Sequence, residues 1–475
     1  MDKVLSVVAV VAYTAMLAFV AVRARVAREF VEFSLARRAL PLALIFGSIA
    51  AAYVGPGFSI GFVGRGFQSG FLFWGIGLAY AVQNILVGLL VAPRLRSLKD
   101  CHTLGDAIGQ KYDRKCQILA GIISVGLCTG FSAVMANAGG VVLSDIFGFP
   151  NWASVVIVVA VTASYTTFGG LRASVITDAF QFTVFSILMP IVLLLAILFH
   201  LNGGAATFAR EASAATAAGL NSTSTIEIVG LVAAFLLGET LIPPYANRAL
   251  ASKTVRVSQN SFILAGIFSA VWFMVMISLG VVARSIIPSG TDEDHVLLNL
   301  VDSIIPVEGH ALLLVVLMSV IMSSLNSLLN AGAIAFAEDV VKPYVKLTDR
   351  TALNIGRCAT IAIAAVAAAG ATAVPSIIKG LLICYAIWAP AILPAAIIGL
   401  WAKHPRPLAG ILSICVGTLV AVTFQFILPS AIKVPAIIPA LGSSILAYIL
   451  GHWLAGESGG ASPTLRLNME CEGWK

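Results

Sequence analysis

Two adjacent serines in the apolar stretch VIMSSLNSLLNAGAIAFAEDVVKP have the types and spacing of cation ligands. On a helix, Ser323 and Ser324 lie three and four residues after Val320 and share a face with it. A main-chain carbonyl keeps a lone pair beyond its helical hydrogen bond, so Val320 and the two hydroxyls offer three neutral oxygens. Oxygen ligands of this kind suit a small hard cation. Serines in apolar helices also pack or bond back to their own helix, and that alternative stays open.

Two apolar segments carry helix-breaking residues near their centres. AAYVGPGFSIG contains Gly-Pro-Gly at residues 55–57, and GETLIPPYANRAL contains Pro-Pro at residues 243–244. Lipid offers no hydrogen-bond partners, so a break at this depth must expose its freed carbonyls and helix ends to something else. Such breaks can serve close packing, but paired breaks in matching positions of two repeats are typical of the binding sites of secondary transporters.

A carboxylate and several aromatic rings accompany the two breaks. Glu239 lies at the second break, and an ionisable group in a membrane helix is costly and therefore functional by default. It could face a cationic substrate, bind a proton, or pair with Arg65 or Arg248. The aromatic residues near the first break and in the following helices are Tyr53, Trp74, Tyr80 and Phe131.

The composition places these residues in a polytopic membrane protein. The 475-residue chain is 59% hydrophobic and only 11% charged, with a mean hydropathy of +0.98, whereas soluble domains carry about 25% charged residues. We predict an all-α protein, because each apolar segment approaches the roughly 20 residues of a spanning helix. The thirteen segments are 4–22, 40–65, 70–93, 116–144, 150–168, 173–200, 226–246, 257–283, 309–336, 354–373, 375–401, 407–428 and 432–453.

The distribution of basic residues predicts the orientation of the chain. Of the 29 Lys and Arg residues, 23 fall on one side of the thirteen segments and six on the other. Basic loops stay on the cytoplasmic side, so we expect the N-terminus outside and the C-terminus in the cytoplasm. The net charge of +7 is explained in this way without nucleic acid as a partner.

The chain is predicted to form one transmembrane domain over residues 1–453, followed by a cytoplasmic tail over 454–475. Within it, residues 1–39 would form an extra N-terminal helix and inner loop, and residues 402–453 two peripheral helices. The core at 40–401 has its broken helices in first and sixth place. That spacing predicts an inverted repeat of five plus five helices.

Four stretches resemble the sodium:solute symporter family, in order and at matching spacings over nearly the whole chain. They are RLRSLKDCHTLGDAIGQKYDRK, YTTFGGLRASVITDAFQ, GETLIPPYANRALASK and SSLNSLLNAGAIAFAEDVVKP. The resemblance implies the leucine-transporter type of fold. It also implies a sodium ion bound by the carbonyls of Ala51, Val54 and Val320 and the hydroxyls of Ser323 and Ser324. Asp178, in the stretch TDAFQ, would be a waypoint for sodium on the cytoplasmic side; a surface helix-start residue is the alternative.

The stretch AAYVGPGFSIG is similar to the choline-transporter branch of that family, in which an aromatic residue precedes a Gly-rich break. Tyr80 also matches a tyrosine of that branch, and aromatic faces bind quaternary ammonium groups. Two other cage positions differ, because Ile242 and Gly130 stand where the branch has tryptophan. The predicted substrate-binding residues are Tyr53, Gly55, Gly57, Trp74, Tyr80, Phe131, Glu239 and Ile242.

These observations predict a sodium-coupled secondary active symporter of the cell membrane, importing a small organic solute by alternating access. The solute is expected to be a choline-like ammonium compound or an amino acid such as proline. We expect no cofactor apart from sodium as the co-transported ion, and no enzyme activity, since none of the six His has a suitable catalytic partner in the sequence. The alternatives are a proton-coupled transporter of an organic acid and a membrane sensor; the sensor is disfavoured because no signalling module precedes Lys475.

Overall fold

A computed structural model describes residues 3–23, 27–200, 203–428 and 434–455, and the regular elements there are helices. The predicted tail lies outside the described residues from residue 456 onward. The α-helices of the first half are α1 (Lys3–Arg23), α2 (Phe30–Leu35), α3 (Leu42–Tyr53), α4 (Phe62–Ser69), α5 (Phe71–Leu86), α6 (Ala92–Ser97), α7 (Leu104–Lys111), α8 (Arg114–Phe147), α9 (Asn151–Leu195) and α10 (Gly204–Ser222). Those of the second half are α11 (Thr225–Leu237), α12 (Pro243–Ala251), α13 (Val255–Ala283), α14 (Val296–Ile304), α15 (Val307–Ala335), α16 (Asp349–Ala371), α17 (Ile377–Trp401), α18 (Pro407–Val422) and α19 (Ile437–Leu454).

Short 3-10 and π segments extend several of these helices. The 3-10 segment is η1 (Ala36–Arg38), and the π segments are η2 (Gly57–Gly61), η3 (Val87–Val91), η4 (Ala196–His200), η5 (Phe336–Val341) and η6 (Thr423–Ile427). A π turn widens the helix and frequently marks a functional position. The segment η2 begins directly after Pro56, so the first predicted break coincides with such a position.

The membrane-spanning architecture follows the predicted apolar segments. Within the described residues, nine helices are long and apolar enough to cross a membrane, or up to eleven if two bent pairs each count as one span. The 45-residue α9 covers two predicted segments and breaks at Gly170, where φ is +59°. Glycine is required there, because a Cβ would lie 2.8 Å from the Cα of Phe33. The total of thirteen spans stays a prediction.

Both predicted interruptions are present. Helix α3 ends at Tyr53, and the helix that continues from Gly57 is bent by 60° relative to it. Helix α11 ends at Leu237, and α12 begins only at Pro243. Leu241, between them, has a φ of +54°, a conformation that residues other than glycine adopt rarely and that is found at functional sites.

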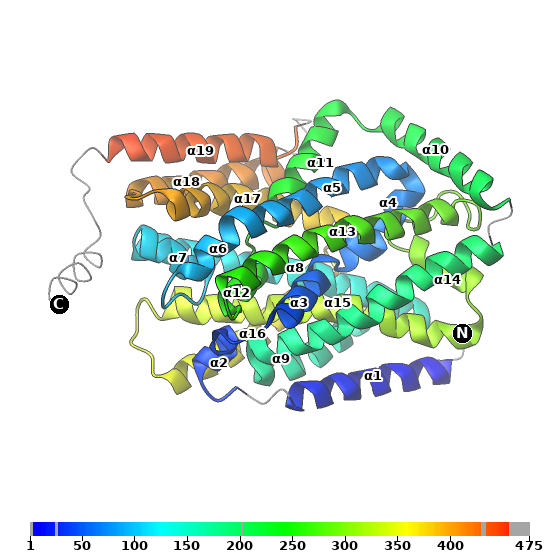
Figure 1. Ribbon diagram of the computed structural model, residues 1–475, viewed down its shortest axis with the longest axis horizontal. Coiled ribbons are helices and arrows are strands. Elements are labelled where there is room, and N and C mark those ends of the chain that lie inside the picture. The colour runs from blue at the N-terminus through cyan, green and yellow to red at the C-terminus, as the bar shows by residue number, and fades with distance from the viewer. Residues whose placement is uncertain (1–2, 24–26, 201–202, 429–433, 456–475) are drawn as a thin grey trace.

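The helices of the two predicted sides gather at opposite ends of the bundle. Figure 1 shows α2, α6, α7 and α12 toward the left and α4, α10 and α14 toward the right. Helix α1 begins at the right, and α19 ends at the left. This placement is consistent with the predicted separation of the two faces, whereas their assignment to outside and cytoplasm stays a prediction.

Helix α15, which carries the paired serines, runs through the centre of the bundle. Of the most apolar 18 residues of this span, 89% are buried. The helix packs against α3, α8, α9, α12 and α16. Most other spans bury a smaller share, because one side faces the surface. A helix enclosed on all sides can hold polar side chains toward both breaks, which places the candidate site at α15.

Candidate functional site

The paired serines of α15 lie against the carboxyl end of α3. The Ser323 hydroxyl donates to the Val320 carbonyl at 3.0 Å and lies 3.4 Å from the Ala51 carbonyl oxygen. The Ser324 hydroxyl lies 3.4 Å from the Val320 oxygen and 3.5 Å from the Ala52 oxygen. The structure therefore gathers neutral oxygens from both helices, and Ser323 and Ser324 are buried. Carbonyl and hydroxyl oxygens at this spacing could hold a sodium ion after small shifts.

The first break positions these oxygens. Helix α3 ends because Pro56 has no N–H to continue its ladder, which leaves the last carbonyls without helical partners. The Val54 carbonyl accepts the Ser59 hydroxyl at 2.7 Å, so this predicted ligand already has a partner. A Cβ on Gly55 would lie 2.6 Å from the Ser324 Oγ. Only glycine allows the chain to pass this close to the serine.

Glu239 lies in the second break and is bound by three tyrosines. The hydroxyls of Tyr80 and Tyr245 both donate to its Oε2, the latter at 2.7 Å, and the Tyr385 hydroxyl donates to its Oε1. The side chain is only 3% exposed. Hydrogen bonds to an ionised acceptor are about twice as strong as neutral ones, so three of them can keep this carboxylate in an apolar environment.

Sequence reasoning missed three of the residues that hold this turn, which are Tyr245 of α12 and Tyr385 and Trp388 of α17. Tyr385 and Trp388 of α17 lie three residues apart on one helix face, and the Trp388 indole donates to the Thr240 carbonyl at 3.0 Å. Gln83 of α5 donates to the Thr240 hydroxyl, also at 3.0 Å. The aromatic pair at i and i+3 was a visible signal, but its direction toward the break depends on the tertiary packing.

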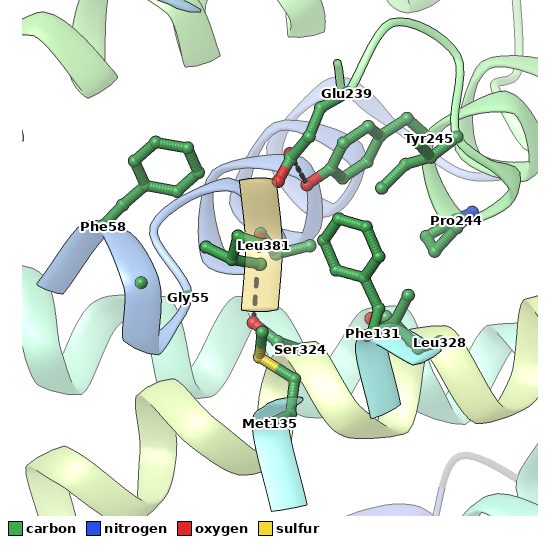
Figure 2. A pocket seen from close by; sticks show the side chains of 14 residues that line it. Gly55, Phe58, Phe131, Met135, Glu239, Pro244, Tyr245, Ser324, Leu328 and Leu381 are labelled. Atoms are coloured by element: carbon green, nitrogen blue, oxygen red, sulfur yellow. Dashed lines mark hydrogen bonds between the residues drawn. The ribbon is translucent and has the colours of Figure 1, made fainter. Parts of the chain in front are cut away.

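A cavity of about 20 Å³ lies between the two breaks. This volume has room for about one water molecule, so a solute can bind there only when the lining side chains move apart. Figure 2 shows Glu239 and Tyr245 on one side of it and Ser324 on the other, with Phe131 and Leu381 between. The predicted substrate residues that line it are Gly55, Gly57, Phe131, Glu239 and Ile242.

Three predicted substrate residues are not among the side chains that line this cavity. Tyr80 and Tyr53 are fully buried behind Glu239 and Tyr245, and their rings meet edge to face with centroids 5.3 Å apart. The indole of Trp74 donates to the Ala270 carbonyl at 3.2 Å, away from the break. Direct contact of these three residues with a substrate stays a prediction.

A buried ion pair lies one helical turn from the serines. The Arg248 guanidinium of α12 pairs with the Asp178 carboxylate of α9, with 2.7 Å between nitrogen and oxygen. Both side chains are at most 1% exposed. Ser48 of α3 and Ser327 of α15 each accept a hydrogen bond from Arg248 and donate to the Asp178 carboxylate. The network joins α3, α9, α12 and α15, and so it includes both interrupted helices. It lies between the paired serines and α12.

The structure corrects three readings of the sequence that concern these charged residues. Arg248 contributes to the count of cytoplasmic loop charges, yet the structure buries it completely, so it does not report orientation. Asp178 is fully buried rather than a helix-start residue at the surface, which rules out that alternative. Glu239 pairs with neither of the suggested arginines, because Arg248 binds Asp178 and Arg65 binds Glu293.

Within the described residues, no group of three or more His, Cys, Asp or Glu could hold a metal ion.

Comparison with known proteins decides the family. The model of the sodium:solute symporter family matches residues 33–410, which is most of the chain. The chain belongs to the sodium:solute symporter family. The matched region contains both breaks, the paired serines and the Arg248–Asp178 pair. Sodium as the co-transported ion fits this membership.

Curated relatives of this family member include sodium/proline symporters of Staphylococcus aureus. They are 26% identical over 299 residues, which is 59% of this chain. The match spans 58% of the length of these relatives. Their names therefore support the family, whereas the transported solute of this chain remains a matter of proposal.

Solved structures confirm the predicted fold class. A sodium-coupled sialic acid symporter in a substrate-bound outward-open state superposes with a TM-score of 0.85, covering 96% of this chain and 99% of its own, at 14% identity. A nucleobase-cation-symport-1 family transporter, closed with bromovinylhydantoin bound, gives a TM-score of 0.57 at 12% identity, covering 91% and 96%. This symporter family member therefore has the leucine-transporter type of fold that its sequence predicts.

The loop before α14 ties several helices together at the end opposite the Arg248–Asp178 pair. Glu293 accepts the Ser376 hydroxyl at 3.0 Å and pairs with Arg65 of α4 at 3.3 Å. Asp294 accepts the Ile377 backbone N–H at 3.1 Å at the start of α17. His295 bonds to Asp145 of α8 at 2.7 Å. The acidic loop of this symporter family member therefore joins α4, α8 and α17.

Raising the pH from 5.5 to 8 is expected to loosen this loop. The hydrogen bond to Asp145 raises the pKa of His295 above its usual value. The stabilisation that protonated His295 contributes is therefore complete below about pH 6.5, the pKa of the unfolded chain, and is lost as the pH rises through the higher pKa of the folded protein. Burial raises the pKa of Asp294 to about 6. Ionising this buried carboxyl therefore costs stability as the pH rises from its unfolded pKa to about 6, which adds to the loss at His295. Comparing melting temperatures of wild type and Asp145→Asn across this range isolates the His295 part. If the melting temperatures of the two proteins changed in parallel with pH, the contribution assigned to His295 would be wrong.

Proposed function

We propose that this chain is a sodium-coupled secondary active symporter that imports a small organic solute with an ammonium group. A choline-like compound or an amino acid such as proline would satisfy this description. The observation that carries the proposal is the position of Ser324, which belongs to the oxygen cluster and also lines the cavity with Glu239. An ion and a solute bound there would share one side chain, which would link the two binding events.

The sodium ligands of this proposal are the five predicted ones: the carbonyls of Ala51, Val54 and Val320 and the hydroxyls of Ser323 and Ser324. Their support is the short distance between the end of α3 and the serines. The Val54 carbonyl accepts the Ser59 hydroxyl and keeps its second lone pair for the ion. The serine hydroxyls, which now donate to carbonyls, would rotate their protons away from a bound cation.

The charge of the cavity supports an ammonium group on the solute. Among the residues that line it, Glu239 is the one carboxylate, and none is Lys, Arg or His. A carboxylate that shares a cavity with the rings of Phe58, Phe131 and Tyr245 attracts a cation through its charge and through the ring quadrupoles. The same charge repels an organic acid, so it disfavours the proton-coupled alternative for that class of solute.

Alternating access would proceed around this site in the cell membrane, with the N-terminus outside and the C-terminus in the cytoplasm. Asp178 would be a waypoint on the cytoplasmic side for the released sodium. Its support is its place one turn from the serines, since Ser327 follows Ser323 by four residues on α15. Release along this route would require Arg248 to part from Asp178.

Sodium is expected to raise the melting temperature of the purified protein relative to potassium at equal ionic strength. A ligand that binds only the folded state stabilises it by about 2.7 kcal/mol at 100 times its dissociation constant. The Ser323→Ala/Ser324→Ala variant should lose this difference while still folding, because both changes are small. The measurement is a thermal unfolding scan in detergent for each salt.

Equal melting temperatures in the two salts for the wild type would count against the sodium site. A sodium effect that survives in the double variant would move the site away from the serines. Ser413→Ala is a matched control, since Ser413 is also fully buried but bonds to Ser444 in the peripheral helices.

A further inference from the structure

Tyr53 lies between the two proposed sites without lining the cavity. It is the last residue of α3 and stands between Ala51 and Val54, whose carbonyls are proposed sodium ligands. Its side chain is fully buried. Any force that fixes those two carbonyls therefore also fixes the backbone on both sides of Tyr53.

The ring of Tyr53 contacts two of the three tyrosines that hold Glu239. Its centroid is 3.9 Å from that of Tyr245 and 5.3 Å from that of Tyr80, both in edge-to-face arrangements. Those two tyrosines donate to the same carboxylate oxygen. On its other side, Tyr53 meets Phe262 of α13 at 6.3 Å. The ring thus fills the space between α13 and the Glu239 donors.

The hydroxyl of Tyr53 is not what makes these contacts. Its oxygen is buried and has no hydrogen-bond partner among the described residues. A buried unpaired hydroxyl costs free energy and contributes nothing to holding Glu239. The ring alone connects the end of α3 with Tyr80 and Tyr245, so phenylalanine could replace it.

We propose that Tyr53 is a positioning residue that couples sodium binding to the solute site. This inference rests on the proposed function, because it needs both the sodium ligands and Glu239. Sodium bound by the Ala51 and Val54 carbonyls fixes the Tyr53 ring, and the ring holds Tyr80 and Tyr245 in place around the carboxylate. The solute then meets a carboxylate that is already oriented. By linkage, solute bound at Glu239 raises sodium affinity by the same factor, and we expect a substitution that disturbs Glu239 to act on sodium through the same contacts.

A thermodynamic cycle with sodium as the probe tests this coupling. The sodium dissociation constant is obtained by titrating the melting temperature of wild type, Glu239→Gln, Tyr53→Leu and the combined variant. Coupling between linked sites is typically 5- to 150-fold. We expect Glu239→Gln to change the sodium dissociation constant at least fivefold when Tyr53 is present. In the Tyr53→Leu background, the same substitution should change it less than twofold.

Conservative and matched variants separate coupling from a general structural role. Tyr53→Phe should keep the full effect of Glu239→Gln, because it keeps the ring. Tyr165→Leu removes another buried tyrosine whose hydroxyl also has no partner among the described residues, and it should leave the effect intact. Tyr53→Met replaces Tyr53→Leu if the latter does not fold.

Two results would overturn the assignment of Tyr53. One is an unchanged sodium constant in Glu239→Gln, and the other is an equally large change with and without the Tyr53 ring. In both results sodium still stabilises the wild type, so the proposed function survives. Absence of any sodium stabilisation in the wild type would instead remove both proposals.

Discussion

Replacing Glu239 with Gln is expected to lower sodium-driven uptake of a cationic solute by a factor of about 30 or more. Truncating one partner of a buried hydrogen-bonded charge pair costs about 2–5 kcal/mol, and each 1.4 kcal/mol is a factor of ten. The amide has nearly the same shape: its oxygen can accept the hydrogen bonds of Tyr80 and Tyr245, and its NH2 group can donate to the Tyr385 hydroxyl. The loss should therefore come from charge. Uptake of labelled choline and proline into proteoliposomes under a sodium gradient measures it.

A second glutamate provides the control for this variant. Glu227 lies in the first turn of α11, the helix that precedes the break, but its side chain is exposed. Glu227→Gln changes the net charge of the protein equally and should leave uptake unchanged. Sodium should still stabilise Glu239→Gln, although at a different concentration. Normal uptake by Glu239→Gln would assign the carboxylate to structure rather than to the solute.

Replacing Arg248 with Gln is expected to lower the free energy of unfolding by about 3–5 kcal/mol. Removing one partner of a buried ion pair leaves the other charge buried without compensation. Asp178 would keep the hydroxyls of Ser48 and Ser327, which cannot neutralise it. The effect is measured as the melting temperature and the denaturant midpoint of the variant in detergent.

An exposed ion pair gives the matched control for Arg248. Arg210 pairs with Glu211 at 3.3 Å with its side chain 73% exposed, so Arg210→Gln should cost no more than about 1 kcal/mol. Adding Asp178→Asn to Arg248→Gln should restore much of the lost stability, because no charge then remains unpaired. A single Arg248→Gln variant as stable as wild type would show that Asp178 is already neutral or has found another partner.

The two breaks could be predicted from the sequence because their causes are local. Proline lacks the N–H that an α-helix needs, and lipid cannot replace it, so Gly-Pro-Gly and Pro-Pro in apolar segments had to interrupt their helices. The spacing of Val320, Ser323 and Ser324 likewise follows from helical geometry alone. The structure confirms the breaks and brings the serines against α3.

The partners of the charged residues could not be predicted in the same way. Tyr385 is separated from Glu239 by 146 residues and reaches it only through the packing of α17 against α11. Arg248 follows a broken helix near an expected basic loop, and in sequence it cannot be distinguished from a loop charge. Whether such an arginine reaches solvent or Asp178 depends on how far α12 enters the bundle. That depth is a tertiary property.

The paired serines have an electrical consequence, since every proposed sodium ligand is uncharged. The site therefore carries one positive charge when sodium is bound and none when it is empty, and each sodium ion moved takes one charge through the membrane potential. One elementary charge crossing 100 mV releases about 2.3 kcal/mol. At 1.4 kcal/mol for each factor of ten, that energy alone could sustain an approximately fifty-fold accumulation of a neutral solute for each sodium ion carried. The ion's own charge makes the voltage a driving force, and uncharged ligands place its action on the sodium-loaded site rather than on the empty one.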